Sequence, residues 1–370
     1  MNTKRIFTLR DSKVSFRRII LLSALLVGIC ACSSGVPPFG NSSNPLKGQM
    51  YSYWNFSLYR TDLASSVSTI LYSQFKKTPQ MPDLGYFDRS AFDVSADGKE
   101  ILLLTYPKGN EFNDKYVFNL VSSDNLGEVH DSFQHYRHGL TSVKLSSDKS
   151  RIAIAGDYYD QPSGSFPRLV EVLDRTGKLI VKYTTDDAGK SFKEIVWLPD
   201  GNLLMVTDFG LFKTDDLTLL HATKLSNAPF NSWGFISSSP DGKRLAFTSG
   251  GRVFTMNLDG SGLVQVTDSD SDSREYATQW SPDGKYLAFR TNIFVYTVGG
   301  PVEGGGTLYK LMVVPADGKK YILKKSYSET IGSTLIGTAT ISGSDGVIAV
   351  KQKDGANYTT VNVENDVSWR

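Results

Sequence analysis

Three of the four histidines lie in one short segment, EVHDSFQHYRHGL, at His130, His135 and His138. Imidazole nitrogens with a neighbouring carboxylate, here Asp131, are ligands that transition metals accept in proteins. The spacing matches no helical H-x-x-x-H metal motif, however, and no helix is expected in this segment. We therefore predict no metal here, and instead a polar connection between strands in which His135 and His138 form part of a recognition surface.

A second segment with candidate ligands is DSDSDSRE, residues 268–275, in which carboxylates alternate with hydroxyls. Alternate carboxylates could supply oxygen ligands to Ca²⁺, but the segment lacks the glycine and the distal glutamate of an EF-hand loop. A solvated acidic connection between strands explains the pattern better. We include Asp270 and Asp272 with the histidines in the candidate binding surface.

The common signatures of enzymes are missing from the sequence. No G-x-S-x-G nucleophile elbow occurs, and the glycine-rich stretch VGGPVEGGGT lacks the lysine of a P-loop. We predict no catalytic residue and no cofactor.

The candidate residues need a scaffold, and a recurring turn indicates one. Six segments place an Asp-containing turn between apolar runs: FDVSADGKEILLL, VKLSSDKSRIAIA, IVWLPDGNLLMVT, ISSSPDGKRLAFT, TQWSPDGKYLAFR and TISGSDGVIAVKQ. The shared aspartates are Asp97, Asp148, Asp200, Asp241, Asp283 and Asp345. They lie 51, 52, 41, 42 and 62 residues apart, which is the period of a four-stranded unit rather than of a helical solenoid.

The chemistry of this turn predicts strands on both sides of it. Ser, Pro, Asp and Gly in this order are preferred in a type I turn whose last residue enters left-handed space, as in a bulged hairpin. The runs at 245–247 and 287–289 are apolar without alternation, which indicates strands buried on both faces. A second Asp/Gly turn follows at residues 174–177, 259–260 and 317–318, so each repeat is expected to hold four antiparallel strands.

Six such sheets arranged radially make a β-propeller, because closing the ring buries both apolar faces of every sheet and leaves few free edges. We predict an all-β, six-bladed propeller, with seven blades as the alternative. One strand from residues 54–75 is expected to close the ring by pairing with a strand at residues 358–363. Trp197 and Trp280 hold the same register before their turns and are expected to pack between blades.

The motif ISSSPDGKRLAFT, followed by NLDGSG and QVTDSDSDSREYATQWSPDG, resembles the WD-like repeats of the TolB propeller. The resemblance covers roughly residues 50–370, is strongest over residues 233–289, and implies the propeller fold. Two repeats depart from it, since SSDKS at Asp148 lacks the Pro and the Gly, and GSDG at Asp345 lacks the Pro. The sequence has no room for the separate N-terminal domain of TolB, so the partners of TolB are not carried over.

The N-terminus has the parts of a processing signal: basic residues, the apolar run IILLSALLVGI at 19–29, and then small residues with both cysteines. This run is too short for a membrane span, which needs about 20 residues. The sequence ICACSSG resembles a bacterial lipobox, which implies that Cys32, after Ala31, receives lipid such as palmitate. We expect a signal peptide at 1–31, a flexible tether at 32–49 and the propeller at 50–370; an ordinary secretory signal is the alternative.

Residues 1–31 hold six basic side chains and one acidic side chain, so their loss changes the net charge from +2 to −3. A mature chain with this charge has no basic footprint for nucleic-acid binding. In the resembled lipoproteins, a serine such as Ser33 after the lipidated cysteine implies the outer membrane. We predict a lipid-anchored, periplasm-facing propeller that binds an envelope protein or a cell-wall component through its loops. The alternative is a propeller enzyme, a polysaccharide lyase or hydrolase, with its site at the channel mouth.

Overall fold

The computed structural model describes residues 45–54, 57–73, 86–106, 115–136, 140–157, 168–184, 192–207, 210–215, 217–226, 233–269, 273–298, 304–328, 335–336, 338–343, 345–354, 357–361, 363 and 367–370. All regular structure among these residues is β-strand. Within the described ranges, no helix has the length and apolar character needed to cross a membrane. The chain divides into Met1–Pro45 and a compact unit, Leu46–Arg370, whose first residue is already buried in the core.

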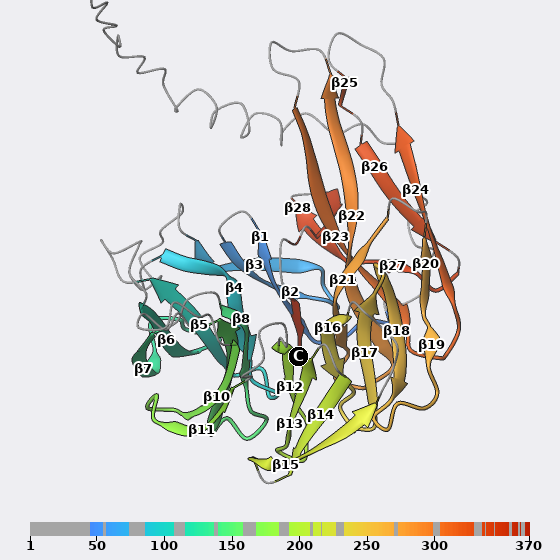
Figure 1. The fold of residues 1–370 in the computed structure, drawn as a ribbon. Coiled ribbons are helices and arrows are strands. Elements are labelled where there is room, and N and C mark those ends of the chain that lie inside the picture. Colours follow the sequence, from blue (N-terminus) through green and yellow to red (C-terminus); the bar gives the residue numbers. More distant parts are fainter. Residues whose placement is uncertain are drawn as a thin grey trace, which may run out of the picture. The chain divides into compact units, whose positions relative to one another are not determined.

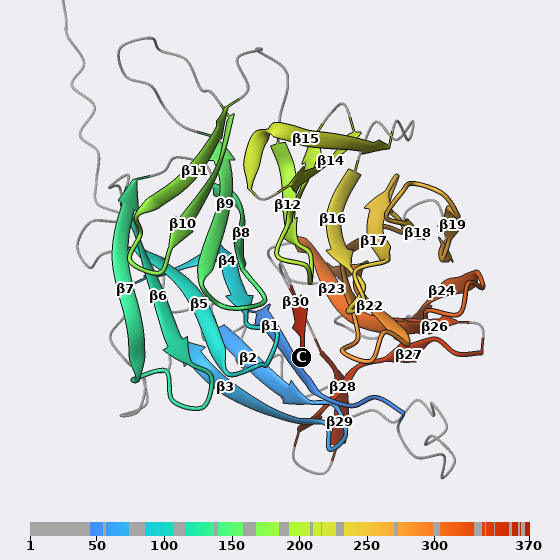
Figure 2. The same cartoon turned by 90° about the horizontal axis from the view of Figure 1, so that it is seen from below.

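Six four-stranded antiparallel sheets stand around a central axis as the blades of a β-propeller, which confirms the predicted fold class (Figure 2). Blade I consists, from the axis outward, of β30 (Val367–Trp369), β1 (Gln49–Trp54), β2 (Ser57–Asp62) and β3 (Val67–Ser73). Blade II consists of β4 (Tyr86–Val94), β5 (Glu100–Tyr106), β6 (Lys115–Ser122) and β7 (Val129–Tyr136). Blade III consists of β8 (Leu140–Leu145), β9 (Arg151–Asp157), β10 (Arg168–Asp174) and β11 (Leu179–Thr184).

The second half of the ring follows the same plan. Blade IV consists of β12 (Phe192–Trp197), β13 (Leu203–Thr207), β14 (Gly210–Asp215) and β15 (Thr218–Ser226). Blade V consists of β16 (Trp233–Ser238), β17 (Arg244–Ser249), β18 (Arg252–Asn257) and β19 (Val264–Gln265). Blade VI consists of β21 (Glu275–Trp280), β22 (Tyr286–Val298), β23 (Gly304–Pro315) and β27 (Ile348–Ala349), and the short β25 (Leu335–Ile336) also pairs with β22.

The core lies between the blades, and this explains the unbroken apolar runs in the sequence. On β5, Ile101 and Leu103 pack against blade I, whereas Leu102 and Leu104 pack against blade III. All four side chains are fully buried. Because successive side chains of a strand point to opposite faces, a strand between two neighbouring blades needs apolar residues at every position. Each of the six junctions between blades holds one such apolar cluster.

The recurring turn joins the innermost strand of a blade to the next strand. In the turn of blade V, the Ser239 hydroxyl donates to Asp241 over 2.5 Å and accepts the Arg244 amide over 2.9 Å, and Gly242 has a φ of 68°. The same bonds recur in the turns that start at Ser95, Ser146 and Ser281. Blade IV has Leu198 in place of the serine, and there Asp200 still accepts the amide of Asn202.

Five of the six predicted turn aspartates lie in turns that join the two innermost strands of a blade. Asp345 also lies in a turn, with Gly346 at a φ of 99°, but that turn does not join two paired strands of one blade. Asp345 follows β26 (Thr338–Gly343), which belongs to a separate sheet with β20 (Thr267–Ser269) and β24 (Tyr321–Ser328). Blade I has no such turn, because its first two strands come from opposite ends of the compact unit. The segment around Asp345 does not form a blade of its own. The sixth blade is blade I, which is built from strands at the two ends of the compact unit, and the total is therefore six.

The ring is closed at a different place from the one predicted. The closing pair is β1 with β30, in the register Met50 with Trp369 and Ser52 with Val367. Residues 358–363 do not take this role: β29 (Asn357–Thr360) forms a hairpin with β28 (Lys351–Asp354), and the Val363 amide donates to Tyr309 on β23. The closing position at the axis is taken by β30, a later strand of only three residues, and not by the predicted strand at residues 358–363.

Blade VI carries the largest departure from the regular plan. Its strands β22 and β23 pair over twelve residue pairs and extend as a long hairpin beyond the ring (Figure 1). On the outer side of blades V and VI, β24 pairs in parallel with β20, which follows the last strand of blade V in the chain. The Tyr321 amide also donates to the Val266 carbonyl over 2.7 Å, so main-chain hydrogen bonds connect the segment after blade V with the segment after β23.

Candidate functional site

The mouth of the central channel, on the face that carries the recurring turns, is hollowed into a cup of about 290 Å³. The innermost strands of all six blades line it, together with residues of the turns that follow them. Trp197, Trp280 and Trp369 supply aromatic surface, and Pro199, Pro240 and Pro282 stand at the rim. A concave, mostly apolar site with a few polar groups is the usual form of a binding pocket.

Two buried polar atoms in the lining of the cup have no hydrogen-bond partner among the described residues. They are Trp280 Nε1 and Ser237 Oγ, in side chains that are 4% and 6% exposed. The equivalent tryptophan of blade IV differs, because Trp197 Nε1 donates to the Lys144 carbonyl over 3.0 Å. Buried polar groups are nearly always paired in folded proteins. The two unpaired atoms lie on the blade V–VI side of the cup.

The main chain beside these atoms is distorted. Phe235 has a φ of 49°, and the pairing of β16 with β17 shifts its register between Gly234 and Ser237. A bulky residue in left-handed space costs about 1–3 kcal/mol and persists only where surrounding contacts hold it. Here the Thr278 hydroxyl of blade VI donates to the Phe235 carbonyl. The bulge re-aims the end of β16, so that Ser237 lines the cup.

Arg370 forms the opposite wall of the cup. Its guanidinium donates to the carbonyls of Val94, over 2.6 Å, and Ser95, over 2.9 Å, and lies 3.6 Å from the Asp93 carboxylate. The same side chain also lines a second, polar cavity of about 640 Å³ between blades I and II. Blade I has no recurring turn, and Arg370 lies where that turn would be. Its guanidinium contacts the start of the turn of blade II through the Val94 and Ser95 carbonyls.

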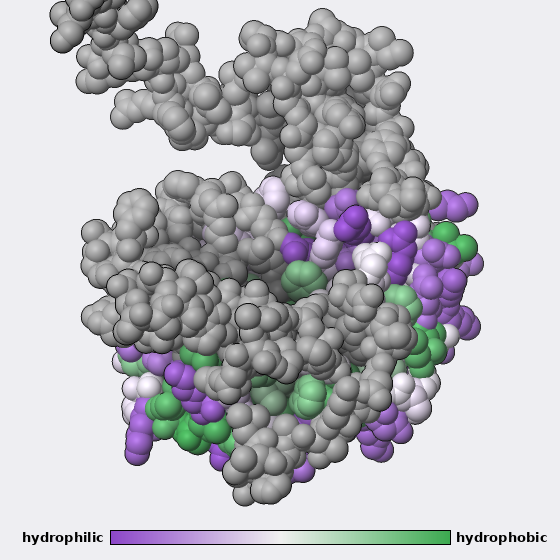
Figure 3. Space-filling view, in the orientation of Figure 1, coloured by the Kyte–Doolittle hydropathy of each residue, from purple (hydrophilic) through white to green (hydrophobic). Residues whose placement is uncertain are grey.

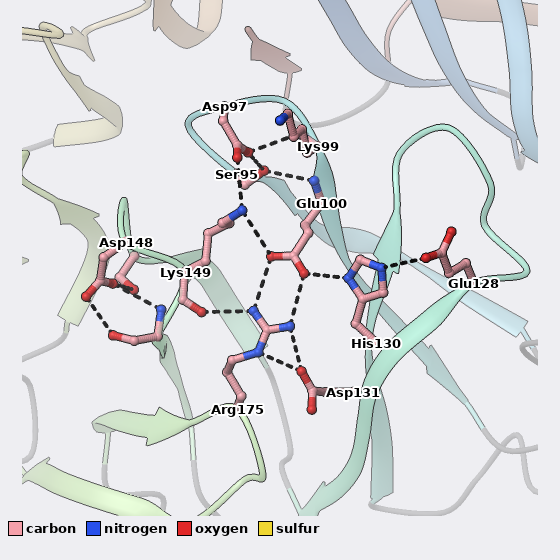
Figure 4. Close-up of polar contacts among 12 residues, drawn as sticks. Ser95, Asp97, Lys99, Glu100, Glu128, His130, Asp131, Asp148, Lys149 and Arg175 are labelled. Carbon is pink, nitrogen blue, oxygen red and sulfur yellow. Dashed lines mark hydrogen bonds and ion pairs between the residues drawn. The ribbon is translucent and has the colours of Figure 1, made fainter.

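A charge cluster joins blades II and III on the same face (Figure 4). Arg175, in the turn after β10, donates to both carboxylate oxygens of Glu100 over 3.0 and 3.1 Å and to Asp131 over 2.6 Å. Lys149 Nζ lies 2.9 Å from Asp97 and 3.9 Å from Glu100. On the other side, His130 Nδ1 lies 2.6 Å from Glu100. We call Asp97, Glu100, His130, Asp131, Lys149 and Arg175 the charge cluster.

The pKa values of the cluster follow from these contacts. Burial works against the charged form of Glu100, but the hydrogen bonds from Arg175 and His130 outweigh it and lower the pKa of Glu100. The hydrogen bond to Glu100 raises the pKa of His130 above its usual value. The hydrogen bond to Asp97 raises the pKa of Lys149 in the same way. The cluster therefore favours the charged form of each of these three groups.

The residues singled out from the sequence do not gather at one place in the described part of the chain. His130 and His135 lie on β7, the outermost strand of blade II, so the expectation that they lie in a connection to the next blade is wrong. His135 Nε2 is 2.8 Å from Glu171 of blade III. Cys32, His138, Asp270 and Asp272 lie outside the described residues, and their roles stay predictions.

No group of three or more His, Cys, Asp or Glu side chains that could hold a metal ion occurs within the described ranges. His130 and His135 each bond a carboxylate there, and neither has a hydrogen bond to a serine hydroxyl. A histidine-activated serine is therefore not assembled by either of these two side chains.

The outer surface offers no comparable apolar site among the residues that the structure describes. Its large exposed apolar side chains are spread over several strands, and include Val67 on β3, Val129 on β7, Leu179 on β11 and Ile322 on β24. In Figure 3, hydrophobic and hydrophilic described residues lie interspersed along the lower part of the molecule. Single exposed apolar residues are normal on protein surfaces, so the cup remains the better candidate.

The cup and the charge cluster were not predicted from the sequence. The cup unites six innermost strands that lie far apart in the chain, and no local motif marks it. A weak signal existed for the cluster: Glu100 stands directly before the apolar run ILLL, where a buried carboxylate needs a cationic partner. Nothing in the sequence identifies that partner as Arg175 of the neighbouring blade.

Comparisons with known proteins give distant likenesses. No protein-family model matches the chain. A stretch of 77 residues is 39% identical to Dipeptidyl-peptidase 5 of Porphyromonas gingivalis and covers 20% of this chain and only 11% of that protein. Among solved structures, TolB from Acinetobacter baumannii is similar with a TM-score of 0.47 and 16% identity, over 79% of this chain and 64% of that chain.

A protein assigned as TolB in Agrobacterium tumefaciens is similar with a TM-score of 0.44 and 16% identity, over 80% of this chain and 90% of that chain. Because these TM-scores lie below 0.5, the fold and the site described above rest on the strand pairing and the contacts of this chain itself.

Proposed function

We propose that this chain is a lipid-anchored propeller of the bacterial cell envelope that binds another envelope protein, by receiving one of its side chains or turns in the cup. The observation that carries this proposal is the pair of buried polar atoms, Trp280 Nε1 and Ser237 Oγ, that line the cup without a partner among the described residues. A protruding group with a carbonyl or carboxylate would accept the Trp280 N–H and pack its apolar part on the tryptophans and prolines.

The size and chemistry of the cup support a protein partner. A cavity of about 290 Å³ lies just below the usual range for small-molecule pockets, about 300–1,000 Å³. Aromatic and arginine side chains in desolvated pockets are the groups that dominate protein–protein binding energy. The cup offers three tryptophans and Arg370 in this setting.

The test compares two tryptophan variants. Trp280→Phe loses indole packing at a buried junction but no described hydrogen bond, so we expect a smaller stability loss than in Trp197→Phe, together with weaker partner binding. Trp197→Phe loses the same indole packing and also the hydrogen bond to the Lys144 carbonyl, so we expect a stability loss about 1 kcal/mol larger than in Trp280→Phe. Its N–H group is already bonded within the chain, so we expect a smaller loss of partner binding than in Trp280→Phe. Urea unfolding measures stability.

Partner binding is measured in cells, by the yield of a cross-link from a photo-reactive residue placed at Pro282 on the rim of the cup. The same residue at Lys178, on the turn after β10 and outside the cup lining, is the positional control. Equal cross-linking from the two positions, or a Trp280→Phe variant that cross-links like the wild type, would show that the cup is not the binding site.

The lipid anchor is supported by the sequence ICACSSG alone. We expect Cys32→Ser to abolish labelling with a palmitate analogue and to release the chain into the soluble periplasmic fraction. Cys30→Ser is the matched control and should leave labelling intact. An unlabelled Cys32→Ser variant that stays bound to the membrane would contradict the anchor. Ser33 after the lipidated cysteine supports placement in the outer membrane, and membrane fractionation of the same strains tests it.

A further inference from the structure

The blade II–III junction differs from the other junctions in how it is held on the turn face. The Lys149 carbonyl accepts Arg175 over 3.1 Å, while the Lys149 ammonium reaches Asp97 and Glu100 on blade II. Lys149 takes this position with a φ of 63°, where the turns of blades II, IV, V and VI have glycine. Left-handed backbone costs a non-glycine residue about 1–2 kcal/mol. The contacts of the Lys149 ammonium with Asp97 and Glu100 offset this strain.

His130 stands at the centre of an excess of carboxylates. Its Nδ1 faces Glu100 at 2.6 Å, and its Nε2 faces Glu128 at 3.5 Å. A neutral imidazole has only one N–H donor, whereas the protonated ring has two. Only the protonated ring can therefore donate toward both carboxylates, and a neutral ring would turn a lone pair toward one of them.

The charges around the His130 imidazole also favour its protonated form. From blade II the carboxylates of Asp97, Glu100, Glu128 and Asp131 face the cluster, and from blade III the permanent cations Lys149 and Arg175 face it. Four negative charges thus meet two permanent positive charges. Protonation of His130 adds the third cation and brings the cluster closer to neutrality.

We propose that the charge cluster is a pH-sensitive latch between blades II and III, closed while His130 is protonated and loosened when His130 loses its proton. The latch holds the two turns that contain Asp97 and Lys149. Ala96 and Ser147 in these same turns line the cup. The effect on partner binding rests on the function proposed above, whereas the latch itself can be tested without any partner.

The pH range follows from the directions of the shifts. The pKa of His130 is raised above 6.5. The stabilisation that protonated His130 gives to the latch is therefore complete below about pH 6.5, and it is lost as the pH rises through the raised pKa. The pKa of Glu100 is lowered below 4.5. The stabilisation that ionised Glu100 gives to the latch is therefore complete above about pH 4.5, and it is lost as the pH falls through the lowered pKa. The latch is therefore tightest in mildly acidic solution, between about pH 4.5 and 6.5.

The experiment is hydrogen exchange of the full chain at pH 6.0 and 8.5, with rates converted to protection factors to remove intrinsic pH effects. The reporters are the amides of Gly98, Glu100, Lys149 and Arg151, which are bonded within the two turns. The equivalent amides of Gly242, Arg244, Gly284 and Tyr286 in blades V and VI serve as internal controls. We expect protection of the reporters to fall about two- to fivefold at pH 8.5, the range for partly exposed ion pairs, while the controls stay constant.

Two variants separate the latch from a general effect of pH. His130→Gln should remove the pH response of the reporter amides. His135→Gln is the matched control, since His135 lies on the same strand but pairs with Glu171, and should keep the response. The same pH response at all four turns, or a full response in His130→Gln, would overturn the latch. If His130→Gln unfolds the chain, NMR titration of His130 in the wild type decides: an imidazole pKa at or below 6.5 contradicts the proposal.

Discussion

Gly177 shows how closely neighbouring blades approach at the level of single residues. It lies in the turn after β10 with a φ of 83°, and a Cβ added there would lie 2.4 Å from Cδ2 of Phe133 on blade II. Phe133 is itself stacked on Phe118, with ring centroids 5.0 Å apart, so it has little freedom to move away. The glycine is therefore required both by the backbone and by the space available.

Alanine substitution separates these two requirements. Gly201 has the same φ of 83° but nothing within 4 Å of an added Cβ, so Gly201→Ala should cost about 1 kcal/mol from backbone strain alone. Gly177→Ala should cost about 1–3 kcal/mol more, because the methyl group must displace the Phe133 ring. Urea unfolding of both variants measures the difference. Equal losses would show that the contact with Phe133 gives way without cost.

At the scale of the strand, β5 illustrates why the repeat could be identified from the sequence. Its side chains pack in alternation against two neighbouring blades, so the apolar run has no polar face. The turn before it supplies the second signal, because the Ser-x-Asp-Gly sequence closes the same set of hydrogen bonds in several blades. Both signals are local, which is why the four-stranded repeat and its Ser-x-Asp-Gly turn were predictable, whereas the sixth blade depends on pairing between the two ends of the compact unit.

Truncation on this strand should be costly. Leu102 is fully buried at the blade II–III junction, so Leu102→Ala should destabilise the chain by about 2–5 kcal/mol. Leu179, on the outermost strand of blade III, is 48% exposed, and Leu179→Ala should change stability by no more than about 0.5 kcal/mol. Thermal and urea unfolding of the pair measure this. Similar effects at the two positions would contradict burial of both faces of β5.

The parts of the structure that the sequence did not predict depend on contacts between distant segments. The closing strand was expected at residues 358–363 because that run alternates like a strand, but β30 has only three residues and too little pattern to be identified. His135 was placed in a connection because polar residues surround it, although β7 pairs with β6 along its whole length. An outermost strand needs little apolar character, so hydropathy does not distinguish it from a loop. The cup and the charge cluster likewise arise only when blades meet.

At the scale of the whole molecule, the seam between the chain ends sustains the ring. The Gln49 amide donates to the Arg370 carbonyl over 2.6 Å, and Trp369 Nε1 donates to Lys47 over 2.8 Å. A Cβ on Gly48, whose φ is 93°, would lie 2.3 Å from the Arg370 carbonyl oxygen. The seam therefore combines main-chain pairing, a buried tryptophan and a contact that excludes any side chain.

Removal of residues 367–370 should destabilise the entire ring rather than one blade. The deletion exposes the edge of β1 and uncovers the apolar cluster between blades VI and I. We expect a lower melting temperature and loss of protection in blades on both sides of the seam. Gly48→Ala should show the same pattern in weaker form. A deletion variant whose protection falls only in blade I would show that the other blades do not depend on closure.

The pairing of β1 with β30 also sets the order in which the chain can be assembled. The two strands are among the first and the last parts of the compact unit to leave the ribosome or a translocation channel, and contacts so far apart in sequence are slow to form. Until residues 367–369 arrive, β1 offers an unpaired edge to any strand that fits it, including the same three residues of a second copy. Folding that is crowded or interrupted at this stage would favour exchanged dimers, in which each ring is completed by the end of the other chain.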